Sequence, residues 1–432
     1  MMNVMKIKNV LAFGVTGLLL TGCSSGSNTA ASLNERFSTA GSAVFVEDPS
    51  NTTFEYDPNA ISSQASVLSI SLALSIAPPA TTNTGGTQLY ASDLKVAGTK
   101  VITTYNVPGA VDKGWIDYVD VTTIALPLLL SSSYLADTDV NSVAMNNGNF
   151  SIVGAKDGVG SILRQGTYGL LGHTLGTSDT LLSSFAGTGV AYNAAGTNLA
   201  VTTGDAGGVS VMNASTLANV GPSVSVTDAR GVAFSSVNNK YYVVSGTTNT
   251  AVTSYDTSGA LVATRALTGA SIAHSKATVV AGSTGEFLLV TTGDGGFNVV
   301  CASDMKIAAS QAAYQYANYA SLGLADPTQT VTNAAVFGPG MIFTASGEAG
   351  IRVYNFLKAA GASTTACQNI TVSYLGYFAF STPVSANNLY YSNVLTTALQ
   401  YTGTLYVAAG AGGFKAVTIT ATRNALNDLI EF

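Results

Sequence analysis

The sequence predicts an all-β fold: a β-propeller of seven four-stranded blades, with the ring closed by an N-terminal strand. The first observation is internal similarity at a period of roughly 42–63 residues, which indicates a repeat architecture. The second is that each repeat reads as short strands joined by turns, and four antiparallel strands form one propeller blade. The third is an isolated alternating strand near the N-terminus, which supplies a means of closing the ring.

The repeat is clearest in hairpins between 141 and 420. In each, an apolar strand runs into a Gly-rich turn and a second strand, and glycine supplies the positive φ that the turn needs. Counting the units places blade starts near residues 90, 141, 189, 231, 276, 332 and 384. The clearest hairpins are 198–213 NLAVTTGDAGGVSVMN, 286–302 EFLLVTTGDGGFNVVCA, 341–356 MIFTASGEAGIRVYNF and 404–420 TLYVAAGAGGFKAVTIT.

The closing strand is predicted from residues 66–76, SVLSISLALSI, which alternate between polar and apolar side chains. Such alternation is typical of a half-buried strand. We expect this stretch, or residues 43–46, to complete the last blade, because an open ring leaves unpaired strand edges.

The N-terminus has the layout of a secretory signal. Lys6 and Lys8 precede an apolar run over 10–20, which is too short to span a hydrocarbon core of ~30 Å. The ending Leu-Thr-Gly-Cys at 20–23 resembles the lipobox of bacterial lipoproteins. The resemblance implies cleavage of residues 1–22, lipidation of Cys23 and anchoring in a membrane. The alternative is an ordinary signal peptide with a chance cysteine.

By the same analogy, Ser24 after the cysteine indicates the outer membrane of a bacterial envelope, with the chain facing the periplasm or the outside. Residues 23–42 then form a lipidated N-terminus and a small, polar tether, and 43–432 form the propeller.

The composition argues against nucleic-acid binding. Charged residues make up 9% of the chain, against ~25% in average soluble domains. The formal net charge is −6, and removal of Lys6 and Lys8 with the signal would make it −8. A basic footprint for nucleic acid is therefore absent.

Two segments resemble known propeller repeats. Residues 229–267 are similar to the YVTN-type repeat, and LYVAAGAGGFKAVTI and IFTASGEAGIRVYNF are similar to the LVIVD repeat of bacterial surface proteins. The resemblance implies the propeller fold and leaves the activity open, because propellers carry many unrelated functions.

Acidic residues recur at the predicted turn between the second and third strands of four blades. They are Asp157, Asp205, Asp294 and Glu348. In a ring they could surround a channel mouth and bind Ca²⁺ or a basic partner. The simpler explanation is turn chemistry, because Asp before Gly is a favoured turn pair. Beyond this Ca²⁺ we predict no cofactor.

Arg230, beside Asp228, is expected on the same face, either paired within the protein, for example with one of those acids, or in contact with a ligand. Cys301 and Cys367 would lie in an oxidising compartment, where they could form a disulfide or remain two separate buried thiols. His173 and His274 are the only histidines, and neither lies in a recognisable catalytic or zinc-binding pattern.

These observations favour a non-enzymatic binding or adhesion module, anchored in the envelope, for a protein or a glycan. One alternative is a periplasm-facing scaffold for the assembly of envelope proteins. The other is a hydrolase or lyase that acts on polymers through the rim carboxylates.

Overall fold

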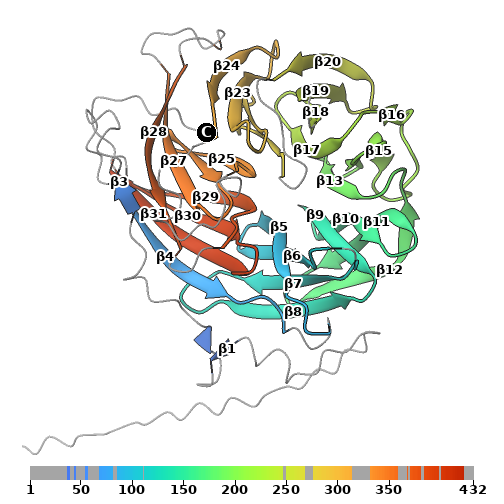
Figure 1. The fold of residues 1–432 in the computed structure, drawn as a ribbon, viewed down its shortest axis with the longest axis horizontal. Coiled ribbons are helices and arrows are strands. Elements are labelled where there is room, and N and C mark those ends of the chain that lie inside the picture. Colours follow the sequence, from blue (N-terminus) through green and yellow to red (C-terminus); the bar gives the residue numbers. More distant parts are fainter. Residues whose placement is uncertain are drawn as a thin grey trace, which may run out of the picture.

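The computed structural model describes residues 37–38, 43–44, 54–56, 68–80, 85–109, 111–246, 250–267, 276–313, 331–358, 367, 370–380, 384–397 and 400–422. The signal peptide, Cys23, the start of the tether and His274 lie outside these residues. Over the described ranges the chain contains strands and no helix, and the strands form a seven-bladed β-propeller (Figure 1).

The blades are numbered 1 to 7 in chain order, and within each blade consecutive strands pair antiparallel. The first four blades are β5 (Tyr90–Ala97), β6 (Lys100–Asn106), β7 (Gly114–Asp120) and β8 (Leu128–Leu135); β9 (Thr138–Asn146), β10 (Asn149–Lys156), β11 (Gly160–Tyr168) and β12 (His173–Leu181); β13 (Gly187–Tyr192), β14 (Asn198–Thr203), β15 (Gly208–Asn213) and β16 (Val224–Ser225); and β17 (Ala229–Ser235), β18 (Lys240–Ser245), β19 (Ala251–Asp256) and β20 (Leu261–Ala266).

Blades 5 and 6 are likewise built from consecutive strands, whereas blade 7 takes its fourth strand from the N-terminal part of the chain. These three blades are β21 (Val279–Ala281), β22 (Phe287–Thr291), β23 (Phe297–Cys301) and β24 (Ile307–Gln311); β25 (Ala334–Gly338), β26 (Met341–Ala345), β27 (Ile351–Lys358) and β28 (Ile370–Phe378); and β29 (Asn388–Thr397), β30 (Gln400–Ala408), β31 (Phe414–Thr422) and the N-terminal β4 (Leu68–Ile76). The predicted blade count is confirmed, and each blade begins within four residues of its predicted start.

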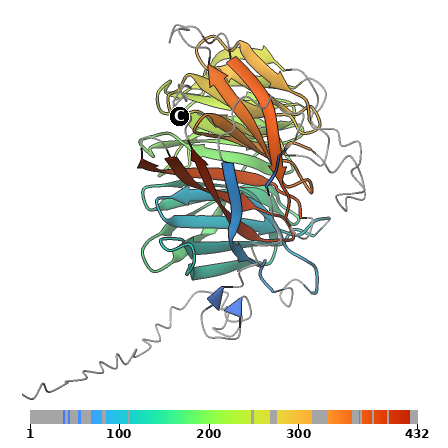
Figure 2. The ribbon, with the colours of Figure 1, turned by 90° about the vertical axis from the view of Figure 1, so that its left-hand side faces the viewer.

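Ring closure by the N-terminal strand is also confirmed. β4 pairs with β31 from Ile76↔Phe414 to Leu68↔Ala421, and Figure 2 shows the two strands side by side. The register shifts between Ala416 and Val417. As a result Ile70 and Leu72 pack between blades 6 and 7, whereas Leu74 and Ile76 pack between blades 7 and 1. One bulged strand thus contributes to both neighbouring cores.

The alternative closing segment does not join the ring. β2 (Ala43–Val44) pairs instead with β1 (Phe37–Ser38). The structure adds one strand that the sequence did not predict: β3 (Phe54–Tyr56) pairs with β28 and extends blade 6 to five strands.

Two glycines per turn explain the repeated hairpin string. In blades 5, 6 and 7 the turn between the second and third strands has positive φ at its first and fourth positions, as at Gly347 (φ 59°) and Gly350 (φ 76°). A Cβ on Gly350 would also lie closer than 3.0 Å to the carbonyl oxygen of Phe378 in the fourth strand. The second glycine is therefore required both by backbone conformation and by close approach of the outer strand.

Candidate functional site

The first strands of the blades surround the centre of the ring. Each contacts the first strand of the next blade, through β5, β9, β13, β17, β21, β25, β29 and back to β5. The turn between the second and third strands of one blade lies beside the start of the first strand of the next blade. Ala386 N, before β29, donates to Gly347 O in blade 6 (2.8 Å), and Thr332 N, before β25, donates to Gly293 O in blade 5 (2.9 Å). We call the side that carries these turns the cavity face.

A central cavity of about 740 Å³ is lined by residues of all seven first strands. Its wall combines aliphatic side chains with several charged and amide groups, among them Asp93, Asn141, Asp228, Arg230 and Lys276. The sequence predicted only Arg230 of this set.

Lys276 ties together blades on different sides of the cavity. It precedes β21 of blade 5, and its Nζ donates hydrogen bonds to the carbonyl oxygen of Ser92 in blade 1 and to that of Asn141 in blade 2 (3.3 Å). Burial lowers the pKa of Lys276, and the nearby carboxylate of Asp93 opposes this shift. The ammonium is therefore a structural tie across the cavity.

Asp93 is the acidic counterpart of this tie. Its side chain accepts hydrogen bonds from Val143 N (3.0 Å), from Leu94 N (2.9 Å) and from Asn388 Nδ2. These donors come from blades 2, 1 and 7, so the buried carboxylate connects three blades. The carboxylate thus serves as a structural link between blades.

Arg230 pairs with Asp228 of its own loop. Its Nε lies 2.9 Å from Asp228 Oδ2, and both residues line the central cavity. Of the expected arrangements, the pairing within the protein is present, with the nearest acid in the sequence. The non-glycine φ of 53° at Asp228 places its carboxylate beside the start of β17.

The four rim acids occupy the predicted turns but do not converge. Asp157, Asp205, Asp294 and Glu348 follow β10, β14, β22 and β26, on four different blades. Of these, Asp205 alone is among the residues that line the cavity. Among the described residues, no group of three or more His, Cys, Asp or Glu side chains is placed to hold a metal ion.

Asp157 belongs instead to a local acidic group that the sequence did not reveal. Burial and the charge of Asp157 raise the pKa of Asp112. Burial raises the pKa of Asp139 to about 7, and the charge of Asp112 adds to this rise. Hydrogen bonds from Val107 N and Lys113 N oppose it. These acids meet where blade 1 adjoins blade 2, so only the tertiary structure brings them together.

Three exposed apolar residues are neighbours of this acidic group in the sequence or through a backbone contact. Val159 (50% exposed) follows Asp157, Val111 (51%) precedes Asp112, and Phe185 (76%) lies in the connection to blade 3. The carbonyl oxygen of Ser184, next to Phe185, accepts a hydrogen bond from the backbone N–H of Ser161, two positions after Val159. This contact brings the segment of Phe185 close to that of Val159. We call Val111, Val159 and Phe185 the rim patch.

His173 lies away from the cavity, in blade 2. Its Nδ1 and Nε2 contact the hydroxyls of Ser131 (2.5 Å) and Ser133 (2.8 Å). Burial lowers the pKa of His173 to about 4. Among the described residues the partners of the ring nitrogens are hydroxyls, and an imidazole with so low a pKa is a weak base at pH 7.

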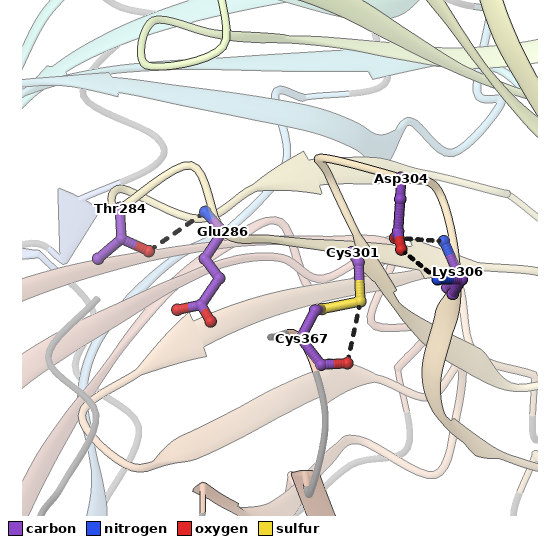
Figure 3. The surroundings of a disulfide bond; sticks show 6 residues. All are labelled: Thr284, Glu286, Cys301, Asp304, Lys306 and Cys367. Carbon is purple, nitrogen blue, oxygen red and sulfur yellow. Dashed lines mark hydrogen bonds and ion pairs between the residues drawn. A yellow bond between two sulfur atoms is a disulfide. The ribbon is translucent and has the colours of Figure 1, made fainter. Parts of the chain in front are cut away.

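Cys301 and Cys367 form a disulfide between blades 5 and 6, so of the two outcomes left open by the sequence the structure contains the bridge (Figure 3). Cys301 ends β23, and Cys367 lies in the connection from β27 to β28. The 3.3 Å contact between Cys301 Sγ and the Cys367 carbonyl oxygen is no hydrogen bond, because a disulfide sulfur carries no proton.

Comparison with known proteins supports the fold alone. The chain matches 1139 chains of solved structures. One of them, the WD40 repeats of RRP9, superposes with a TM-score of 0.52 at 14% identity, over 78% of this chain and 96% of that one. No family model matches the sequence, and no curated protein matches it. The class defined by fold and site is thus a seven-bladed β-propeller.

In the part of the chain that the structure describes, no helix is long and apolar enough to cross a membrane.

Proposed function

We propose that this chain is an envelope-anchored, non-catalytic binding propeller of the LVIVD/YVTN type, which holds a protein partner on its cavity face. The proposed anchor is a lipid on Cys23, which follows the lipobox-like residues 20–23. The quoted hairpin strings support the repeat type.

The rim patch is the observation that carries the proposal. Large exposed apolar side chains gathered on one surface mark interaction sites more often than isolated ones do. Here Phe185, Val159 and Val111 are exposed, and Ala186, which follows Phe185, lines the central cavity. Aromatic anchors of this kind supply much of the binding energy in protein interfaces.

The surrounding charge indicates the chemistry of the partner. Asp112, Asp157 and Asp205 stand next to the three apolar residues, while the nearby Lys156 is paired with Asp179 (2.8 Å). Charge complementarity therefore favours a partner segment with an apolar side chain flanked by Lys or Arg.

Site-specific photocrosslinking in the native bacterium tests this proposal. A photoreactive phenylalanine analogue at Phe185 should give a discrete adduct with another envelope protein. The same analogue at Leu261, which is 60% exposed on the outer strand of blade 4, should not. Equal labelling at both positions, or no adduct at Phe185, would contradict the proposal.

A second variant identifies the charge contribution. Asp157→Asn with Asp205→Asn should weaken the adduct at Phe185 and make it less sensitive to salt, because the acids attract the basic segment through solvent. Protease treatment of intact cells separately shows whether the propeller faces outward.

A further inference from the structure

Blade 2 carries a row of polar side chains across all four of its strands, at the end opposite the cavity face. Asn146 of β9 pairs with Asn149 of β10, Asn149 with Thr167 of β11, and Thr167 with Thr174 of β12. Directly paired residues on neighbouring strands project to the same side of a sheet. Two amides and two hydroxyls therefore stand in line on one side of the blade.

This row borders a hollow of about 490 Å³ between blades 2 and 3. Elsewhere the two blades meet through apolar side chains such as Val153, Leu163 and Val201. The fourth strand of blade 3, β16, pairs only with Gly208 and Val209, at the other end of β15. At the end of β15 near the hollow the chain turns back on itself, with Asn219 bridging Met212, and Thr167 and Thr174 on the outer strands of blade 2 are exposed.

The lining of the hollow is polar but uncharged. It consists of Asn, Gln, Thr, Ser and Tyr side chains together with glycine and alanine, and contains no Asp, Glu, Lys, Arg or His. Amides and hydroxyls both donate and accept hydrogen bonds. A neutral ligand rich in hydroxyl groups matches such a surface, whereas a charged ligand would find no counter-charge.

Some of these groups are fixed and others face solvent. Asn146 Nδ2 donates to Asn193 O (3.1 Å), and Gln165 Nε2 donates to Ala214 O (2.8 Å), which orients both amides. Within the described ranges, the side chains of Asn149, Thr167 and Thr174 are exposed and make no hydrogen bond to the chain. The site thus has a rigid wall and unused polar groups along its rim.

We propose that this hollow binds a neutral saccharide. The volume lies in the range of roughly 300–1,000 Å³ that holds small ligands in proteins. The site is distinct from the rim patch, because it lies on the opposite end of blade 2. Its occupancy does not depend on the protein partner proposed above.

Saturation-transfer difference NMR on the intact chain tests the proposal. The probes are glucose, galactose, mannose and N-acetylglucosamine with their di- and trisaccharides, and glucuronate as a charged comparison. At least one neutral probe should receive saturation, and glucuronate should receive less than glucose.

The matched variants locate the binding. Thr167→Val with Thr174→Val removes two hydroxyls and keeps the β-branched shape, and should weaken binding about tenfold or more. Thr177→Val, at an exposed position on the same strand outside the hollow, should leave binding unchanged. Unchanged far-ultraviolet circular dichroism verifies that all variants fold.

Two results would overturn the inference: no neutral probe receives saturation from the wild-type chain, or binding survives in the Thr167→Val, Thr174→Val variant. Neither result bears on crosslinking at Phe185. Loss of that crosslink would conversely leave saccharide binding intact, so the two proposals fail separately.

Discussion

The ammonium group of Lys276 donates a hydrogen bond to the carbonyl oxygen of Ser92, 184 positions earlier in the chain. The contact connects blade 5 to blade 1 across the central cavity. A propeller is otherwise held mainly by contacts between adjacent blades, so a tie of this kind stabilises the ring as a whole.

Replacing Lys276 with Met should therefore destabilise the protein. The variant leaves the carbonyl groups of Ser92 and Asn141 without their donor, at a cost of about 1–3 kcal/mol. Urea unfolding followed by fluorescence measures the change. Lys306→Met is the control, because that side chain is 70% exposed and pairs with Asp304 at the surface. Equal stability of the two variants would argue against the cross-cavity tie.

Gly350→Ala should be among the most damaging small substitutions in the ring. The positive φ and the nearby Phe378 carbonyl both exclude a Cβ, so we expect a loss of about 1–3 kcal/mol. Gly169→Ala is the matched control, since nothing lies within 4 Å of its Cβ position. Thermal melts of both variants compare them directly, and an unaffected Gly350→Ala variant would show that the turn can relax.

The disulfide should contribute to stability through the unfolded chain. Cys301 and Cys367 are 66 positions apart, and closing a loop of that length is worth up to about 4 kcal/mol in the chain-entropy model. Cys301→Ser with Cys367→Ser should lower the urea midpoint by a corresponding amount. Adding a reductant should lower the wild-type midpoint and leave that of the double variant unchanged. A midpoint that responds equally in both proteins would contradict this.

His173 should make stability depend on pH between about 4 and 6.5. Its folded pKa of about 4 lies below the ordinary value of 6.5, so in this window the unfolded chain binds more protons. The contribution is present above pH 6.5 and is lost as the pH falls through 4. His173→Asn should flatten the dependence of the unfolding free energy on pH in this window. An identical slope in variant and wild type would mean that the imidazole of His173 is not desolvated.

Asp139 should act in the opposite direction. Its pKa of about 7 lies above the ordinary 3.8, so the folded chain binds more protons and loses stability as the pH rises from about 4 through 7. Asp139→Asn removes the buried charge, and should be more stable relative to wild type at pH 8 than at pH 4. Asp304→Asn, at a surface position, should show little of this increase. A difference between Asp139→Asn and wild type that does not grow with pH would rule out the raised pKa.

Sequence pattern predicted the blades well because strand and turn are local properties. The polar–apolar alternation of residues 66–76 and the paired glycines around Glu348 encode a strand and a hairpin within a few residues. The same reasoning missed β3, because a three-residue strand carries almost no periodicity and its pairing with β28 is set more than 300 positions away.

The site was far less accessible to sequence reasoning. Four acids at equivalent turns suggested a ring of carboxylates, yet equivalent turns of different blades are held apart by the width of the ring. Asp205 reaches the cavity wall, whereas Asp157 lies near Asp112, which in turn lies near Asp139. No local signal distinguishes these outcomes.

The sequence by itself determined the strand pattern, the number of blades and the closing strand, since periodicity and glycine conformation act over short segments. Only the tertiary structure decided which distant polar groups meet: Lys276 with Ser92, Asp93 with Asn388, and the row from Asn146 to Thr174. Those meetings depend on register between strands and on the position of each blade in the ring, which no short segment encodes.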